Sequence, residues 1–384
     1  MGAFYIRRLC VKFFMKKKKF LSLLLFSILI LFVFFPVYYL NQNIERQNIS
    51  TGFHFLTQEA GFEISETLIT YNSYLPYSKA LITGLVNTIY VAIIGNIFAL
   101  ILGILLGVFS LSSNFLLSKF CFLYLNFFRN IPLLLQLFFW YGIFTDVLPS
   151  VKRATPFLGI VASNRGIAFP WFNSSWAIFF IVLILIICAV FIFLLNSWAK
   201  KIFKSNKKMF LCMAFIAFLI IQFNMLIRFF PLDYPIVSGF NVRGGLNFTP
   251  EFLSLLLGLV LYTGAFLGEI VRSGILAVDK GQWEAAYALG LTKIQTLQKI
   301  ILPQSFKVAL PPMTAQFLNL TKNSSLAVAI GYPDFVSVAN TTMNQTGQAV
   351  ELVLMIMGLF LFTSLSVSSV ANLINRKLLG VNRR

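Results

Sequence analysis

Long runs of apolar residues, separated by short polar segments, dominate this chain. A helix needs about 20 mostly apolar residues to cross the hydrocarbon core of a bilayer. The sequence contains eight runs of that length, at about 20–40, 81–111, 120–145, 176–196, 209–230, 251–275, 313–332 and 350–373. The pattern therefore predicts an all-α, polytopic membrane protein with about eight transmembrane helices.

The basic residues between these runs predict the orientation of the chain in the membrane. Lys and Arg accumulate on the cytoplasmic side. They precede the first span and then recur in alternate connections, at Lys119 and in the segments 200–208, 276–312 and 374–384. We therefore expect both termini in the cytoplasm. The opposite side carries the acidic loop 41–80, and its one basic exception consists of Lys152, Arg153 and Arg165.

The first span follows a basic stretch, as the apolar part of a signal peptide does. The run at 20–40 is longer than such a part usually is, and no small-x-small cleavage site follows it. This favours a retained signal-anchor helix over a cleaved signal peptide.

Composition narrows the class of protein further. Of the 384 residues, 58% are hydrophobic and 11% are charged, so the chain cannot present an ordinary soluble surface. The net charge of +19 comes from clusters between spans, which argues for topology signals and against nucleic-acid binding. His54 is the only histidine, and the four cysteines form no CxxC pair, so we expect neither a metal site nor a disulfide framework.

A polar segment after the span at 251–275 has the features of a helical hairpin. Ala285 and Ala286 give a slim helix surface. Gly290 is suited to end this helix in the left-handed conformation. Apolar anchors for a partner's groove are offered by Trp283, Tyr287 and Leu289.

A second short helix follows in the same segment. Thr292 and Gln295 are spaced as a capping box that opens it, and Pro303 is expected to close it. The segment therefore predicts a helix–turn–helix that a partner protein binds; the alternative is an ordinary amphipathic loop.

Segment 146–250 differs from its surroundings, because prolines and glycines punctuate it before two further spans. We interpret it as an insertion. The expected organisation is a basic N-terminus 1–19, a signal anchor 20–40, a periplasmic loop 41–80, a first core part 81–145, the insertion 146–250, a second core part 251–373 that contains the polar loop 276–312, and a basic tail 374–384.

Polar residues within spans are candidate functional groups, because they are costly in hydrocarbon unless they are paired or face water. Arg129 and Gln136 flank Pro132, which breaks the backbone hydrogen-bond ladder. Gln136 either lines a pathway or makes an interhelical hydrogen bond, and Arg129 either transmits motion or reaches the membrane surface.

Glu269 and Arg272 are three residues apart, so they can pair on one helix face. Either they form a local ion pair, or they form a gate contact with a partner subunit.

The densest polar run within a span follows the hairpin. Gln316, Asn319 and Asn323 share one helical face, and Thr321 lies among them in sequence. This stripe either contacts a small zwitterionic substrate or holds helices together. The polar segment from Gly331 to Gly347 is expected to be an outward loop on which a substrate-delivering protein docks.

The hairpin also carries a family pattern: Glu284-Ala285-Ala286, three residues, Gly290, nine residues, then Ile300-x-Leu302-Pro303. This resembles the cytoplasmic loop of permease subunits of bacterial ABC importers, in which the loop docks on the ATP-hydrolysing subunit. The resemblance implies a type I importer core of five helices, with the signal anchor and the two inserted helices outside it.

Three other segments narrow the resemblance. The segment from Arg129 to Gln136 resembles polar amino-acid permeases, and Thr321 to Pro333 resembles general L-amino-acid importers of the Aap/Bzt type. Gly52 to Leu56 resembles their Q-type permease. The implied partners are a paralogous M-type permease, an ATP-binding subunit dimer and a periplasmic amino-acid-binding protein.

The resemblance implies ATP-driven uptake of polar L-amino acids by alternating access in the bacterial inner membrane. No Gly-Lys dipeptide occurs in the chain, so it has no phosphate loop, and ATP and Mg would be bound by the partner ATPase. The alternative is an ion-coupled secondary amino-acid transporter, against which the lack of paired intramembrane carboxylates argues.

Overall fold

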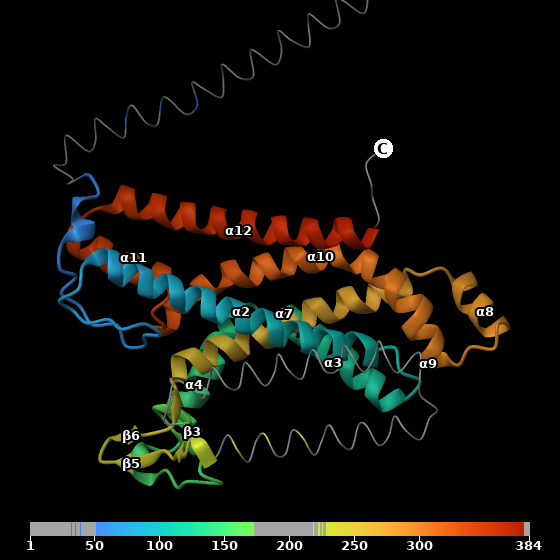
Figure 1. Ribbon diagram of the computed structural model, residues 1–384, viewed down its shortest axis with the longest axis horizontal. Coiled ribbons are helices and arrows are strands. Elements are labelled where there is room, and N and C mark those ends of the chain that lie inside the picture. The colour runs from blue at the N-terminus through green and yellow to red at the C-terminus, as the bar shows by residue number, and fades with distance from the viewer. Residues whose placement is uncertain are drawn as a thin grey trace, which may run out of the picture.

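The computed structural model describes residues 51–172 and 228–379, together with the isolated positions 32, 35, 39, 218, 222 and 225. This part of the chain is mostly helical, which confirms the predicted fold class. Long helices run roughly along one direction, and two short helices project beyond one end of them (Figure 1). The predicted span at 176–196 and most of those at 20–40 and 209–230 lie outside the described residues.

Helices begin and end the described part of the chain, and short strands lie between them in sequence. The helices are η1 (His54–Thr57), α2 (Tyr77–Phe109), α3 (Phe115–Asn130), α4 (Leu133–Gly142), η2 (Ile143–Val147), η3 (Val151–Arg153), α7 (Pro250–Leu276), α8 (Lys280–Ala288), α9 (Lys293–Thr296), η4 (Leu297–Ile301), α10 (Leu302–Asn323), η5 (Ser324–Ile330), α11 (Phe335–Thr346) and α12 (Ala349–Leu379). The strands are β1 (Val161–Ser163), β2 (Gly166–Phe169), β3 (Trp171–Phe172), β4 (Leu232–Asp233), β5 (Ile236–Ser238), β6 (Asn241–Arg243) and β7 (Leu246–Phe248).

Among the described residues, three helices are long and apolar enough to cross a membrane by themselves: α2, α7 and α12. Helix α3 and the helical segment from Leu133 to Val147 are long and apolar enough only when they are taken together, and they are bent by 101° relative to each other. They form a fourth crossing if this broken pair counts as one span. Ile131 has extended backbone angles at this bend, as expected for a residue that precedes proline. The predicted break at Pro132 is confirmed.

Helices α2 and α7 pack in parallel through glycines. Gly103 faces Gly264 and Leu267, and Gly107 faces Gly268. Small residues four apart on both helices let the two backbones approach closely, as in membrane helix pairs generally. The pairing therefore depends on the absence of side chains along this contact.

Helix α10 differs from the predicted span at 313–332. It begins at Leu302, passes through two consecutive prolines and ends at Asn323, where the tighter helix η5 takes over. Gly331 then ends η5 in the left-handed conformation, with φ of +80°. The polar loop 276–312 is therefore shorter than expected, because its last residues belong to α10.

Helix α11 occupies most of the polar segment that was expected to be a loop, so the prediction of a loop is wrong between Phe335 and Thr346. Asp334 caps the helix by accepting a hydrogen bond from the Ser337 amide at 2.8 Å, and Gly347 ends it with φ of +71°. Both end signals are readable in the sequence, but the polar composition between them hid the helix.

Short antiparallel strands occupy the described parts of the predicted insertion. β1, β2 and β7 form one three-stranded sheet, and β3–β4 and β5–β6 form two-stranded pairs. These strands lie near the start of α7, at the end of the molecule away from α8 (Figure 1). Their lengths of two to four residues explain why no strand pattern stood out in the sequence.

The segment 51–76 lies against the starts of α2 and α7. The Asn87 side-chain amide donates hydrogen bonds to the carbonyl oxygens of Glu66 and Pro333, both at 2.9 Å. The Thr249 hydroxyl donates to the Glu66 carboxylate at 2.6 Å. One amide of α2 thus joins this segment to the turn before α11.

Candidate functional site

The predicted docking segment forms a helical hairpin of α8 and α9 at one end of the long helices (Figure 1). Asp279 begins α8 by accepting a hydrogen bond from the Gly281 amide. Ala286 is fully buried, whereas Glu284 and Ala285 are exposed. The outer face of α8 therefore presents small and acidic side chains.

The apolar side chains of the hairpin differ in exposure, although Trp283 and Tyr287 are one helical turn apart and their rings lie 6.5 Å from each other. Tyr287 is 47% exposed and Leu289 is 79% exposed, so both are available to a partner. Trp283, which was expected to be a third anchor, instead packs against the chain's own cluster around Ile275 and Ile301. This side chain therefore attaches the hairpin to the long helices.

The turn of the hairpin has the predicted geometry. Gly290 is left-handed, with φ of +75°. The Leu291 amide donates to the Ala286 carbonyl at 3.1 Å, which satisfies one of the free carbonyls at the end of α8. The capping box of Thr292 and Gln295 is present at the start of α9. The conformation of this turn is therefore encoded locally.

The end of the hairpin differs from the prediction at Pro303. This residue does not close the second helix but lies in the first turn of α10, directly after the π-helical turn η4. Between α9 and α10, the π-helical turn η4 continues the chain without a break. Ile301 is fully buried, and Ile300 and Leu302 pack in the same cluster. The Ile-x-Leu-Pro part of the motif therefore anchors the hairpin to the long helices.

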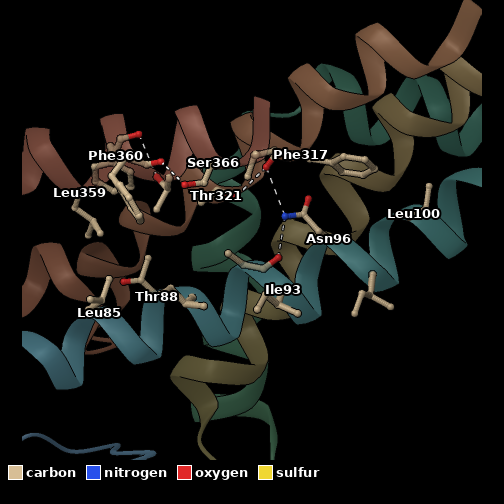
Figure 2. Close-up of a pocket in the computed structure, with 16 residues that line it drawn as sticks. Leu85, Thr88, Ile93, Asn96, Leu100, Phe317, Thr321, Leu359, Phe360 and Ser366 are labelled. Atoms are coloured by element: carbon tan, nitrogen blue, oxygen red, sulfur yellow. Dashed lines mark hydrogen bonds between the residues drawn. The ribbon is translucent and has the colours of Figure 1, made fainter. Parts of the chain in front are cut away.

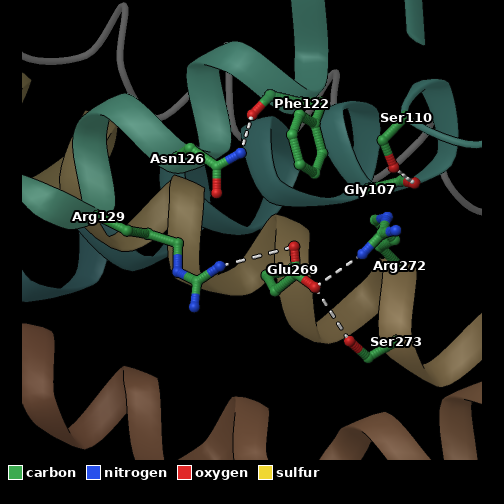
Figure 3. Close-up of polar contacts among 8 residues, drawn as sticks. All are labelled: Gly107, Ser110, Phe122, Asn126, Arg129, Glu269, Arg272 and Ser273. Carbon is green, nitrogen blue, oxygen red and sulfur yellow. Dashed lines mark hydrogen bonds and ion pairs between the residues drawn. The ribbon is translucent and has the colours of Figure 1, made fainter. Parts of the chain in front are cut away.

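Arg129, Glu269 and Arg272 lie together, as Figure 3 shows. The Glu269 carboxylate is 3.0 Å from Arg272 on the same helix and 3.6 Å from Arg129 on α3. The Ser273 hydroxyl also donates to it at 3.3 Å. The predicted pairing of Glu269 with Arg272 is confirmed as a contact, and Arg129 extends it from α7 to α3.

Each arginine of this cluster also lies over an aromatic ring. The Arg129 guanidinium carbon is 5.4 Å from the centre of the Phe266 ring, and that of Arg272 is 5.9 Å from the centre of the Phe122 ring. Cation–π contacts of this kind help to hold guanidinium groups beside apolar surroundings. All three charged side chains remain a quarter to a third exposed, so water or a partner can still reach them.

Gln136 is buried at the bend between α3 and α4. Its amide nitrogen donates to the carbonyl oxygens of Phe128 and Ile131, both at 3.0 Å. These carbonyls belong to the end of α3 and would otherwise lack partners, because the helix stops before Pro132. In this conformation the side chain supports the bend.

The four candidate pathway residues of α10 lie on two faces of the helix. Gln316 and Asn323 are half-buried and Asn319 is exposed, and none of the three has a side-chain hydrogen bond within the described part of the chain. Thr321 is about 140° away from Gln316 around the helix, at about 100° per residue. It therefore lies on a different face from the stripe.

Thr321 faces an apolar cavity of about 520 Å³ between α2, α10 and α12 (Figure 2). Asn96 lies in the same cavity, and its amide nitrogen donates to the Ala92 carbonyl at 2.8 Å and to the Phe317 carbonyl at 3.5 Å. Three further hydroxyl side chains around this cavity, those of Thr88, Thr363 and Ser366, donate to carbonyl oxygens of their own helices. The other lining residues are aliphatic or aromatic, so the cavity is suited to apolar groups and not to an amino acid.

Sequence reasoning missed the two asparagines of α2. Asn87 and Asn96 are lone amides in a long run without charges, and such residues in a span are candidates for structural or functional contacts. Asn87 joins three segments, and Asn96 joins α2 to α10. Their isolation in an apolar run was the signal that could have found them.

Two carboxyl groups outside the membrane-spanning segments have raised pKa values. Burial raises the pKa of Asp334 to about 7, although backbone hydrogen bonds oppose the shift. Burial also raises the pKa of Glu66, and the nearby Glu251 adds to the rise while the Thr249 hydroxyl opposes it. Both groups lie near the starts of α2 and α7, away from the α8–α9 hairpin.

Comparisons with known proteins agree with these features. The family described as "Binding-protein-dependent transport system inner membrane component" matches residues 186–380. The chain is 40% identical over 371 residues to the general L-amino acid transport system permease protein AapQ of Rhizobium johnstonii, a match that covers 95% of this chain and 92% of that protein.

A second relative and one solved structure are also similar to this chain. The glutamate/glutamine/aspartate/asparagine transport system permease protein BztB of Rhodobacter capsulatus is 35% identical, and the match covers 91% of this chain and 92% of that protein. The crystal structure of an amino acid ABC transporter with histidines is 19% identical, with a TM-score of 0.48 over 78% of this chain and 95% of that one.

Proposed function

Because this chain belongs to the family of inner membrane components of binding-protein-dependent transport systems, we propose that it is one permease subunit of an ATP-driven importer of polar L-amino acids. The names of AapQ and BztB support this substrate class, since one refers to general L-amino acids and the other to acidic amino acids and their amides. The observation that carries the proposal is the exposed α8–α9 hairpin with its Glu-Ala-Ala and Gly290 positions.

The proposed docking surface binds a separate ATPase subunit. Small residues let a helix lie close to a partner's groove, and the two exposed apolar side chains supply buried area on binding. ATP and Mg are bound by that ATPase, and this surface of the chain contributes docking alone. The surface consists of Glu284, Ala285, Tyr287, Ala288 and Leu289.

The hairpin is attached to the long helices in a way that transmits movement. Trp283 and Ile301 share one packed cluster with Ile275 at the end of α7. From α7, the contact of Glu269 with Arg129 leads on to α3. A displacement of α8 therefore acts on α7, α10 and α3 together, which supports alternating access driven by closure of the ATPase dimer.

The remaining parts of the assembly follow from the same proposal. Gln316, Asn319 and Asn323 face a pathway that this chain forms with a second, paralogous permease subunit, and a periplasmic binding protein delivers the amino acid at the end opposite α8. The chain lies in the inner membrane with α8 and both termini on the cytoplasmic side.

The docking surface is tested by the double variant Tyr287→Asp/Leu289→Asp. Both side chains are exposed, so the chain should fold, but the ATPase subunit should no longer co-purify and amino-acid uptake should be lost. The matched control is Tyr74→Asp/Leu158→Asp, because these side chains are 79% and 82% exposed and lie far from the hairpin. Retention of the ATPase by the hairpin variant would disprove the docking role.

A further inference from the structure

A second cavity, of about 510 Å³, lies between the end of α2 and the α8–α9 hairpin. Its inner wall is apolar and includes Val108, Phe109 and Leu276. Its rim is polar and includes Ser112 and Ser113 in the turn that follows α2. The lining therefore changes from apolar to polar at the end of α2.

Two lysines complete the rim of this cavity. Lys280 begins α8 and Lys293 begins α9, and neither has an ion pair or a hydrogen bond from its side chain within the described part of the chain. The acidic residue next to Lys280 in sequence is Asp279, whose carboxylate accepts a hydrogen bond from the Gly281 amide. Two ammonium groups thus flank an apolar space without a carboxylate assigned to either of them.

We propose that this cavity binds an anionic phospholipid, with the phosphate between Lys280 and Lys293 and an acyl chain against the apolar wall. Basic pockets between membrane helices are suited to lipid headgroups of this kind. Trp283 also lines the cavity, and tryptophan is enriched at the level of the headgroups.

The apolar wall distinguishes a lipid from a soluble anion. A free phosphate would use the lysines and leave Val108, Phe109 and Leu276 uncovered. The exposed apolar face of α2 continues from Phe109 through Leu105 and Ile101, so an acyl chain has a path along the helix away from the rim. The occupant is therefore amphiphilic and negatively charged at one end.

A lipid in this position touches both the end of α2 and the start of the docking hairpin. It fills a space beside the cluster that joins α8 to α7, and so steadies the hairpin against the long helices. Anionic lipid is then a condition for firm attachment of the hairpin, separate from the docking of the ATPase.

The test is native mass spectrometry of the complete transporter with phosphatidylglycerol or phosphatidylcholine. The variant Lys280→Gln/Lys293→Gln should bind phosphatidylglycerol roughly 25-fold more weakly, about fivefold for each lysine near the membrane surface. The control Lys119→Gln/Lys299→Gln removes two exposed lysines that do not line the cavity, and should change the affinity less than about twofold.

Equal phosphatidylglycerol binding by the two double variants would overturn the proposal. Equal retention of phosphatidylglycerol and phosphatidylcholine by the unchanged transporter would also overturn it. Displacement of the lipid by inorganic phosphate would overturn it as well, because the lysines would then bind a soluble anion. Binding is measured without transport, and co-purification of the ATPase is recorded in parallel, so a failure here is distinct from a failure of the proposed function.

Discussion

Glu269 lies between two arginines from different helices, and only one of these two contacts could be predicted from the sequence. The spacing of Glu269 and Arg272 predicts a pair on one helix face. Arg129 is far away in the sequence and reaches Glu269 only because α3 packs beside α7.

The pathway residues of α10 were predictable to a similar extent. The spacing of Gln316 and Asn319 could be taken from the sequence, but the cavity that Thr321 faces depends on where α2 and α12 lie.

Reversing charges in this cluster should show that all three residues are coupled. The double variant Glu269→Arg/Arg272→Glu should fail to restore stability, because it places a new arginine beside Arg129. Adding Arg129→Glu recreates one basic group between two acidic groups and should recover roughly 1 kcal/mol for each pair. Thermal unfolding in detergent and amino-acid uptake measure the effect. Full recovery by the double variant would show that Arg129 is not part of the unit.

Asp334 should make stability depend on pH. Its pKa is raised from 3.8 to about 7 by burial, so the folded state favours the protonated form. The free energy of unfolding should therefore fall as the pH rises from about 4 to about 7, by up to roughly 4 kcal/mol. Asp334→Asn keeps an acceptor for the Ser337 amide without the charge. We expect a higher Tm than that of the unchanged chain at about pH 8, and a flatter profile; identical profiles would contradict the assignment.

Among the elements, those with local signals were predictable and those set by tertiary packing were not. The break at Pro132, the left-handed Gly290 and the capping box of Thr292 each depend on a few neighbouring residues. Helix α11 and the early start of α10 were missed, because their polar composition is offset by packing against other helices. Apolar length alone finds spans that face lipid more readily than helices that face other helices.

The glycine contacts of α2 with α7 should be sensitive to a single methyl group. A Cβ at Gly107 would lie 2.6 Å from the Gly268 carbonyl oxygen, so Gly107→Ala should destabilise the chain by about 1–3 kcal/mol through overpacking. Gly358 on α12 has nothing within 4 Å, which makes Gly358→Ala the matched control. That control should be neutral or slightly stabilising, since alanine favours helix. Equal Tm values for the two variants would show that the close approach does not contribute to stability.

For the whole molecule, composition and apolar length were enough to predict a helical membrane protein, and the hairpin pattern was enough to predict its family. The arrangement of the described helices was not predictable, because it depends on contacts such as those of Gly103 and Asn87 between distant segments. The small sheets near the start of α7 were also missed, since strands of two to four residues carry too little pattern.

The energy source of uptake is a property of the complete assembly. We expect uptake of labelled glutamate or glutamine to stop when ATP is depleted, because the driving force comes from the partner ATPase. Collapse of the proton gradient at constant ATP should leave uptake nearly unchanged. Both conditions are compared in vesicles that contain the permease pair, the ATPase and the binding protein. If uptake were lost when the proton gradient is collapsed while ATP is kept constant, an ion-coupled transporter would be favoured.

The parallel pairing of α2 with α7 also affects how the chain is made. Leu276 leaves the ribosome 167 residues after Phe109 (276 − 109), which takes roughly 10–30 s at 5–20 residues per second. During that interval the glycine face of α2 has no partner, yet α2 must already reside in the bilayer. Helix α2 has no charged residue after Lys79, so it can remain in the lipid bilayer without a helix partner until α7 is synthesised.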